Sequence, residues 1–199
     1  MVDSWNKLAK VSIQEKGGTV YQFGARTQDI DINEGDRGGH GEASVDGSRI
    51  WIDEPQADGT VTLKMRPIDL DTTSADGGLF QQYRGGTFDT SDPLITDDDG
   101  IITGSAAAST LLRDEYRISV LWTNDSANTT ADGSVTAGKL GLRFVAQSCR
   151  IVSHSASFAN MDLVINVTLK FPPRSVGNVW NYDWQSCTTA EMAALAAYT

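Results

Sequence analysis

The sequence has no run of apolar residues near the ~20 that a helix needs to cross a bilayer. Residues 1–16 lack the apolar core of a secretory signal, so we expect neither a membrane anchor nor export by a secretory pathway. Apolar residues make up 40% of the 199 positions and charged residues 21%, which is not the composition of a disordered chain. We therefore expect a single folded domain over residues 1–199.

Cysteine and histidine are scarce, with two of each. Cys149 and Cys187 lie too far apart for metal-ligand spacing, and two idle thiols are a better interpretation than a disulfide. His40 and His154 have no nucleophile motif beside them, and the acidic run at 97–99 lacks the spacing of a calcium loop. We expect a protein that is not an enzyme and that binds no cofactor or metal.

Positive charge is also scarce. The net charge is −10 and the pI about 4.5, which argues against a general nucleic-acid binder and against an anionic membrane as partner. Aspartate outnumbers glutamate, and lysine is rarer than arginine. Such a surface suits concentrated salt, where ions screen its self-repulsion, and so indicates a halophilic source. An ordinary acidic protein with aspartate-rich turns is the alternative.

A period of two dominates the apolar pattern. Apolar side chains alternate with polar ones at 61–65, 118–122 and 163–171, as expected for strands that bury one face. Residues 140–171 predict a long hairpin that turns near 159–162, and further strands are expected at 10–15, 19–32 and 49–52. The fold class is therefore mostly β, an antiparallel β-sandwich or barrel.

Short helices and long loops complete the expected fold. Helices are predicted at 105–113 and 188–198, with a weaker one at 78–83. Residues 33–48, 85–100 and 124–138 are rich in glycine, charge or small polar side chains and predict long loops. Loops this long in a small β domain are usually functional, so we expect them to order against a neighbour. Residues 173–199 would form a C-terminal arm with a short helix.

The order of these elements resembles the major tail protein, the subunit of the tail tube of tailed viruses. Residues 23–70 carry an acidic step Asp29-Ile30-Asp31, a charged loop near 34–37 and a TVTL strand from Thr60 to Leu63 that ends near Pro67. Residues 116–123 resemble the central strand of that family, 143–172 its closing hairpin, and 173–184 its final extended arm.

The resemblance implies a structural virion protein that is made in the host cytoplasm. Its copies would form rings, usually hexameric, that stack into a tube, with other tail proteins at the tube ends. Viral DNA would pass through the lumen without specific binding, and no membrane would be involved. With the composition, it points to a virus of a halophilic archaeon. We predict that the subunit interface includes Glu34, Asp36, Arg37, His40, Trp180, Tyr182 and Trp184.

Two other functions stay open from the residues alone. A carbohydrate-binding or capsid-decoration β-sandwich would need exposed aromatic rings, and the segment from Trp180 to Trp184 could form such a platform or dock on a neighbour. A hydrolase site assembled from distant loops would leave no local motif.

Overall fold

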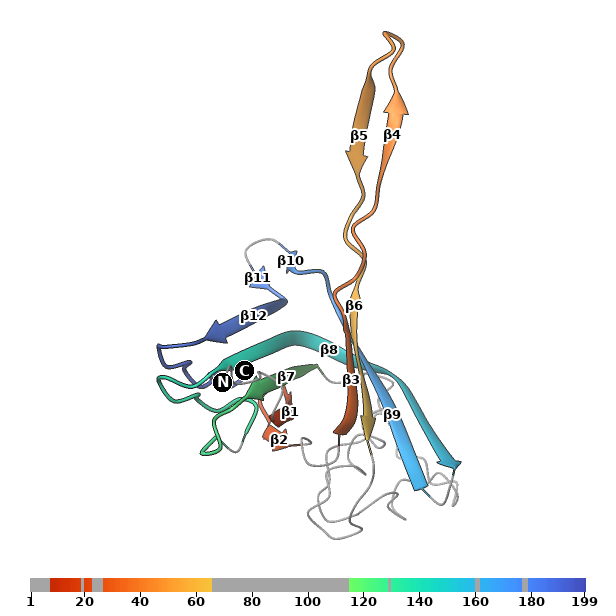
Figure 1. Cartoon of the computed structure of the whole chain (residues 1–199). Coiled ribbons are helices and arrows are strands. Elements are labelled where there is room, and N and C mark those ends of the chain that lie inside the picture. The colour runs from red at the N-terminus through yellow and green to blue at the C-terminus, as the bar shows by residue number, and fades with distance from the viewer. Residues whose placement is uncertain are drawn as a thin grey trace.

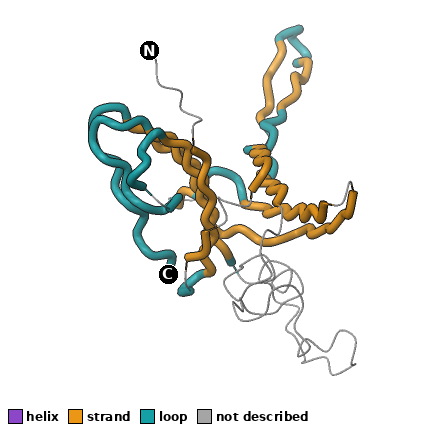
Figure 2. Tube along the Cα trace, turned by 60° about the horizontal axis from the view of Figure 1, so that its bottom comes forward, coloured by secondary structure: helices purple, strands orange, loops and turns teal. Residues whose placement is uncertain are grey.

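A computed structural model describes residues 8–18, 20–22, 27–65, 115–128, 130–159, 162–176 and 179–199. Every regular element in these ranges is a strand, and Figure 2 draws no helix there. No helix that could span a bilayer occurs in these ranges. The mostly-β, antiparallel fold class is confirmed. The helices predicted at 78–83 and 105–113 and the loop at 85–100 lie outside the described residues.

The described ranges contain twelve strands. Their bounds are β1 Leu8–Glu15, β2 Val20–Gln22, β3 Thr27–Asn33, β4 Gly39–Ala43, β5 Arg49–Asp53, β6 Gly59–Met65, β7 Tyr116–Thr123, β8 Gly141–Ala159, β9 Asp162–Phe171, β10 Ser175–Val176, β11 Val179–Trp180 and β12 Tyr182–Cys187.

Strand β8 organises the main sheet, whose order is β2-β1-β7-β8-β9-β6-β3. Its first part pairs with β7 on one side and with β12 on the other, and from Arg150 onward it pairs with β9. The change of partner falls at an irregularity of the β7 register beside Ser148, which has a φ of 55°. A β-bulge of this kind bends a strand and increases its twist, and Figure 1 shows β8 curving from β12 to β9.

The alternation seen in the sequence makes the core. Val61, Leu63 and Met65 of β6 face inward and are fully buried, as are Ile118 and Val120 of β7. They pack in one cluster with side chains from β1, β8, β9 and β12. Both parts of the main sheet therefore contribute to a single core. The hairpin predicted over 140–171 is confirmed, with Ala159 opposite Asp162.

The C-terminal segment 188–198 is irregular apart from an isolated bridge at Met192, so the prediction of a helix there is wrong. Met192 exchanges two backbone hydrogen bonds with Val135, at 2.9 and 3.1 Å. The guanidinium of Arg143, which is fully buried, donates to the carbonyl of Ala193 at 2.9 Å. The segment therefore satisfies its backbone against the body of the protein, and these contacts override its helix propensity.

The strand pairing in the structure corrects two other predictions. The single strand expected over 19–32 is two strands, because β2 pairs with β1 whereas β3 pairs with β6. The loop expected over 33–48 contains β4, which forms a hairpin with β5. The loop expected over 124–138 is confirmed, apart from the isolated bridge of Val135 with Met192.

Candidate assembly surface

The hairpin of β4 and β5 stands clear of the other strands in both overall views (Figures 1 and 2). Its register places His40 opposite Ile52 and Glu42 opposite Ile50, so these four side chains share one face. Trp51 belongs to the opposite face. All five residues of β5 are exposed, including Ile50 at 57% and Trp51 at 67%.

The packing of Trp51 on β4 explains why this glycine-rich segment forms a strand. The Trp51 indole covers the backbone of β4, because a Cβ placed on Gly39 would lie 2.7 Å from three of its ring atoms. The indole N–H donates to Asp53 Oδ1 at 2.8 Å, which fixes the ring. An aromatic side chain over a strand glycine replaces the packing that glycine lacks. This cross-strand contact has no local signature in β4 itself.

The turn of the hairpin is built by Asp46. Its Oδ1 accepts hydrogen bonds from the backbone N–H of Ser48 at 3.0 Å and from the Ser48 hydroxyl at 2.7 Å. The hydrogen bond from the Ser48 hydroxyl contributes most to lowering the pKa of Asp46, so the carboxylate is ionised at neutral pH. Gly47 has a φ of 85°, which suits glycine. Val45, next to Asp46, is fully exposed.

A hydrogen-bond network fixes the root of the hairpin to β12. Trp184 Nε1 donates to Glu34 Oε1 at 2.5 Å. Gln56 Nε2 donates to the Glu34 carbonyl and to the Tyr182 hydroxyl, both at 2.8 Å. Trp184 also stacks on Trp122, with ring centroids 6.0 Å apart and planes at 20°. The root of the hairpin is therefore fixed by hydrogen bonds, whereas no other element of the described chain packs on its outer part.

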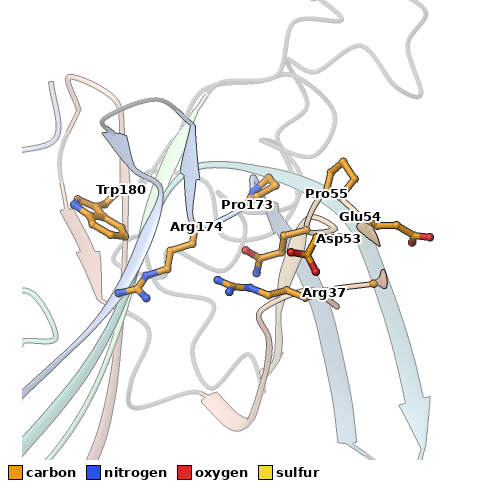
Figure 3. Close-up of a pocket in the computed structure, with 9 residues that line it drawn as sticks. Arg37, Asp53, Glu54, Pro55, Pro173, Arg174 and Trp180 are labelled. Carbon is orange, nitrogen blue, oxygen red and sulfur yellow. The ribbon is translucent and has the colours of Figure 1, made fainter. Parts of the chain in front are cut away.

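An open cleft of about 750 Å³ lies beside this root. Arg37 reaches it from the hairpin side, while Arg174 and Trp180 reach it from the C-terminal arm (Figure 3). The Arg174 guanidinium lies 4.7 Å from the centroid of the Trp180 ring, and Nη2 donates to Asp183 Oδ1 at 3.0 Å. Trp180 remains 59% exposed. The cleft thus combines two cations and the carboxylates of Asp53 and Glu54 with one solvent-facing aromatic ring.

The predicted interface residues divide into three groups. Glu34, Tyr182 and Trp184 meet at the root of the hairpin. Arg37 and Trp180 line the cleft together. The last two lie apart from the cleft lining and are described next.

His40 lies on the projecting hairpin, where Nδ1 is 3.2 Å from Glu54 Oε1 and Nε2 is 3.5 Å from Glu42 Oε1. Asp36 contributes its backbone carbonyl, which accepts from the N–H of Ala57 at 3.0 Å. Val45 and Arg174 are not among the interface residues predicted from the sequence. An exposed valine in an Asp-Gly turn is a usable signal for the first, whereas nothing local marks the second.

The solvent face of the strands β8, β9, β6 and β3 is polar and rich in hydroxyl and amide groups. The register aligns Ser153, Thr168, Thr62 and Asp31 in one row across the four strands. The hydroxyls of Thr62 and Thr168 lie 3.2 Å apart. A second row consists of Ser155, Asn166, Lys64 and Asp29. A third row adds two cations, Arg150 and Lys170, beside Thr60 and Asn33. These cations pair with Glu115 at 3.4 Å and with Asp58 at 2.9 Å. The face is therefore hydrophilic and carries charges of both signs.

Both thiols are free and buried, as the sequence indicates. Burial raises the pKa of the Cys149 thiol to about 12 and also raises the pKa of Cys187. Within the described ranges, no three His, Cys, Asp or Glu side chains gather in a way that could hold a metal ion. Nothing in this part of the chain therefore points to nucleophilic or metal chemistry.

Comparison with known proteins gives matches among solved structures alone. No protein-family model and no curated protein matches the sequence. A chain of the PVC sheath-tube complex of an extracellular contractile injection system, in its extended state, is 11% identical. The match covers 94% of this chain and 93% of that one, with a TM-score of 0.49.

Two further matches carry similar descriptions. The tube-terminating cap of the anti-feeding prophage is 9% identical over 94% of this chain and 92% of that one, with a TM-score of 0.48. Hcp1 from Flavobacterium johnsoniae is 10% identical over 94% and 98%, with a TM-score of 0.32. Identities and TM-scores this low assign no function to the chain.

Proposed function

We propose that this chain is a structural, non-enzymatic subunit that assembles with copies of itself into stacked rings and so forms the tail tube of a virion. The observation that carries the proposal is the hairpin of β4 and β5, which presents apolar side chains on both faces without cover in the described chain. An isolated two-stranded hairpin is marginally stable in water and needs a further surface to pack on. A neighbouring copy supplies that surface in a tube.

Lateral contacts within a ring would use the outer edge of β3. This strand ends the path of the main sheet, and from Ile30 to Asn33 it pairs only with β6 among the described residues. A regular strand edge offers unpaired N–H and C=O groups that template another strand. A strand of the next copy on this edge gives a head-to-tail contact, which closes into a ring when the rotation allows it. The resemblance in sequence order favours six copies.

The lumen would be lined by the polar face of β8, β9, β6 and β3. The face carries Asp29 and Asp31 beside Lys64. Its two other cations, Arg150 and Lys170, are paired with Glu115 and Asp58, so the face has little unpaired positive charge to hold phosphate. Viral DNA would then pass without adhering. Other tail proteins would cap the tube ends, and the subunit would be made in the host cytoplasm.

Negative-stain electron microscopy and sedimentation velocity of the purified protein, in low and in high salt, test the proposal. High salt is included because the composition suits a halophilic source. We expect rings or hollow tubes of uniform diameter. A monodisperse monomer at millimolar concentration in both buffers would contradict the proposal.

A hairpin deletion is the matched control. The Glu54 N–H donates to the Gly38 carbonyl at 3.0 Å, so a two-residue Asn-Gly turn can replace residues 39–53 without moving the root. The deletion should keep the circular dichroism spectrum of a β protein and lose the stacking of rings. Unchanged stacking would show that the hairpin is not the element that joins rings.

A further inference from the structure

We propose that the hairpin turn of one copy, residues 44–48, binds in the root cleft of a second copy, with Val45 against Trp180 and Asp46 between Arg37 and Arg174. The inference deepens the proposed function and rests on it, because it names the surface that receives the hairpin. The occupant is a second copy of this chain.

The cleft is lined by two arginines and two carboxylates, and within the described ranges one of the arginines has no ion pair. No ion pair joins Arg37 to a carboxylate in the described part of the chain. Of the acids beside it, Asp53 accepts the Trp51 indole N–H, and Glu54 faces His40 at 3.2 Å. Figure 3 shows the Glu54 side chain pointing away from the two arginines. The guanidinium of Arg37 is therefore the group in the cleft that an incoming carboxylate would pair with.

The second arginine and the tryptophan form a platform. Arg174 lies over the Trp180 ring and uses Nη2 for Asp183, and a guanidinium has further N–H donors. Trp180 is 59% exposed, and Pro173 belongs to the same lining. An apolar side chain placed there would lose contact with water at the same time as an adjacent carboxylate meets the two cations.

The turn has the matching chemistry in adjacent residues. Val45 is fully exposed at the end of the hairpin, and Asp46 follows it with an ionised carboxylate. The hydrogen bonds from Ser48 fix the Asp46 side chain before binding, which lowers the entropy cost of docking. An apolar tip beside a single anion complements an open aromatic ring and the guanidinium of Arg37, which is unpaired among the described residues.

The geometry of the hairpin allows this contact to repeat. Arg37 and Asp46 are nine residues apart along an extended strand, which corresponds to about 30 Å at ~3.3 Å per residue. The turn and the cleft thus lie at opposite ends of one projecting element (Figure 1). Contacts between two different patches of identical copies are head-to-tail and propagate along an axis. We expect an axial repeat of at least about 30 Å.

Charge reversal tests the contact. Asp46→Arg and Arg37→Glu each place like charges together, and each should raise the concentration at which stacks form by about tenfold or more. Mixing preformed rings of the two variants restores opposite charges wherever a ring of one variant meets a ring of the other, so an equimolar mixture should form alternating stacks within about threefold of the wild-type concentration. Analytical ultracentrifugation and electron microscopy measure both values.

Two variants separate charge from folding. Asp46→Asn keeps an oxygen for the Ser48 hydrogen bonds and removes the charge, so it should weaken stacking while the Trp51 fluorescence of the hairpin stays unchanged. Lys139→Glu makes the same change in charge as Arg37→Glu at an exposed position away from the cleft, and should stack like the wild type.

The outcomes separate this inference from the proposed function. If the variants form rings and only the mixture stacks, both stand. If the single variants stack like the wild type, or the mixture does not recover, the contact is wrong while self-assembly stands. A wild-type protein that never associates overturns both.

Discussion

At the scale of single residues, Ser148 sets the course of β8. Its φ of 55° is left-handed, which costs a non-glycine residue about 1–2 kcal/mol. The position is held because the Ser148 N–H donates to the Tyr198 hydroxyl at 3.1 Å while β8 changes partners there. Backbone strain of this size persists only where the surroundings determine it.

We predict that Ser148→Val lowers the free energy of unfolding by about 1–2 kcal/mol, because a β-branched side chain is least compatible with positive φ. Ser148→Gly should change it by less than about 0.5 kcal/mol, since the relief of strain is offset by the entropy of glycine in the unfolded chain. Urea unfolding measures both. Equal losses for the two variants would show that the backbone conformation is not the cause.

We predict that the buried Cys149 thiol makes the protein less stable at alkaline pH. Burial raises its pKa from 9.0 to about 12, so above pH 9 the unfolded chain releases a proton that the folded chain keeps. The free energy of unfolding is therefore unaffected by this thiol below pH 9. It falls as the pH rises toward 12, by up to about 1.4 kcal/mol per pH unit. Cys149→Ala should lack this component of the slope in urea unfolding between pH 9 and 11. Parallel pH profiles would contradict the assignment.

At the scale of elements, the hairpin of β4 and β5 depends on one ring over one glycine. Gly39→Ala places a Cβ against the Trp51 indole at 2.7 Å, whereas at Gly41 the nearest ring atom is 3.9 Å away. We predict that Gly39→Ala displaces Trp51 and opens the hairpin to proteolysis, while Gly41→Ala does not.

The melting temperature should change little in either variant, because the hairpin is not part of the core cluster. Fluorescence and limited proteolysis report on the hairpin, and circular dichroism reports on the body. Equal protease sensitivity of the two variants would show that the contact with Trp51 does not hold the hairpin.

Some of the strands can be predicted from the sequence alone. The strands β6, β7 and β9 follow from alternation, since a face buried in one core leaves a period of two in the sequence. Alternation predicts neither the hairpin at 39–53 nor the irregular C-terminal segment. The first depends on Trp51 reaching across to another strand, and the second on Arg143 and Val135, which lie far away in sequence.

At the scale of the whole molecule, stability is unevenly distributed. β7 and the first part of β8 are paired on both sides and face the core, whereas β5 is exposed along its length. Segments with few buried contacts open with small free energies, so their amides exchange quickly.

We predict that amides of residues 39–53 exchange within seconds in the free subunit, while those of β7 stay protected for hours. After assembly the amides at 39–53 should become protected and those of β7 should not change. Hydrogen exchange with mass spectrometry measures both states. Protection of 39–53 in the free subunit would show that the hairpin needs no neighbour.

The candidate surface was predictable in part. The sequence placed Glu34, Arg37 and the segment from Trp180 to Trp184 at an interface, and the structure brings these residues to one region around the hairpin root. Their role at an interface stays a prediction. The cleft also contains Arg174, which lines it together with Arg37 although the two residues are far apart in the sequence.

The sequence by itself determined the β class, the inward faces of the strands, the long hairpin of β8 and β9 and the buried thiols, because alternation and burial are written locally. Only the tertiary structure decided that a glycine-rich segment stands out as a hairpin, that the C-terminal segment is not helical, and that Arg37 and Arg174 share a cleft. Each depends on a contact between residues distant in sequence, and no local periodicity encodes which distant partner a side chain meets.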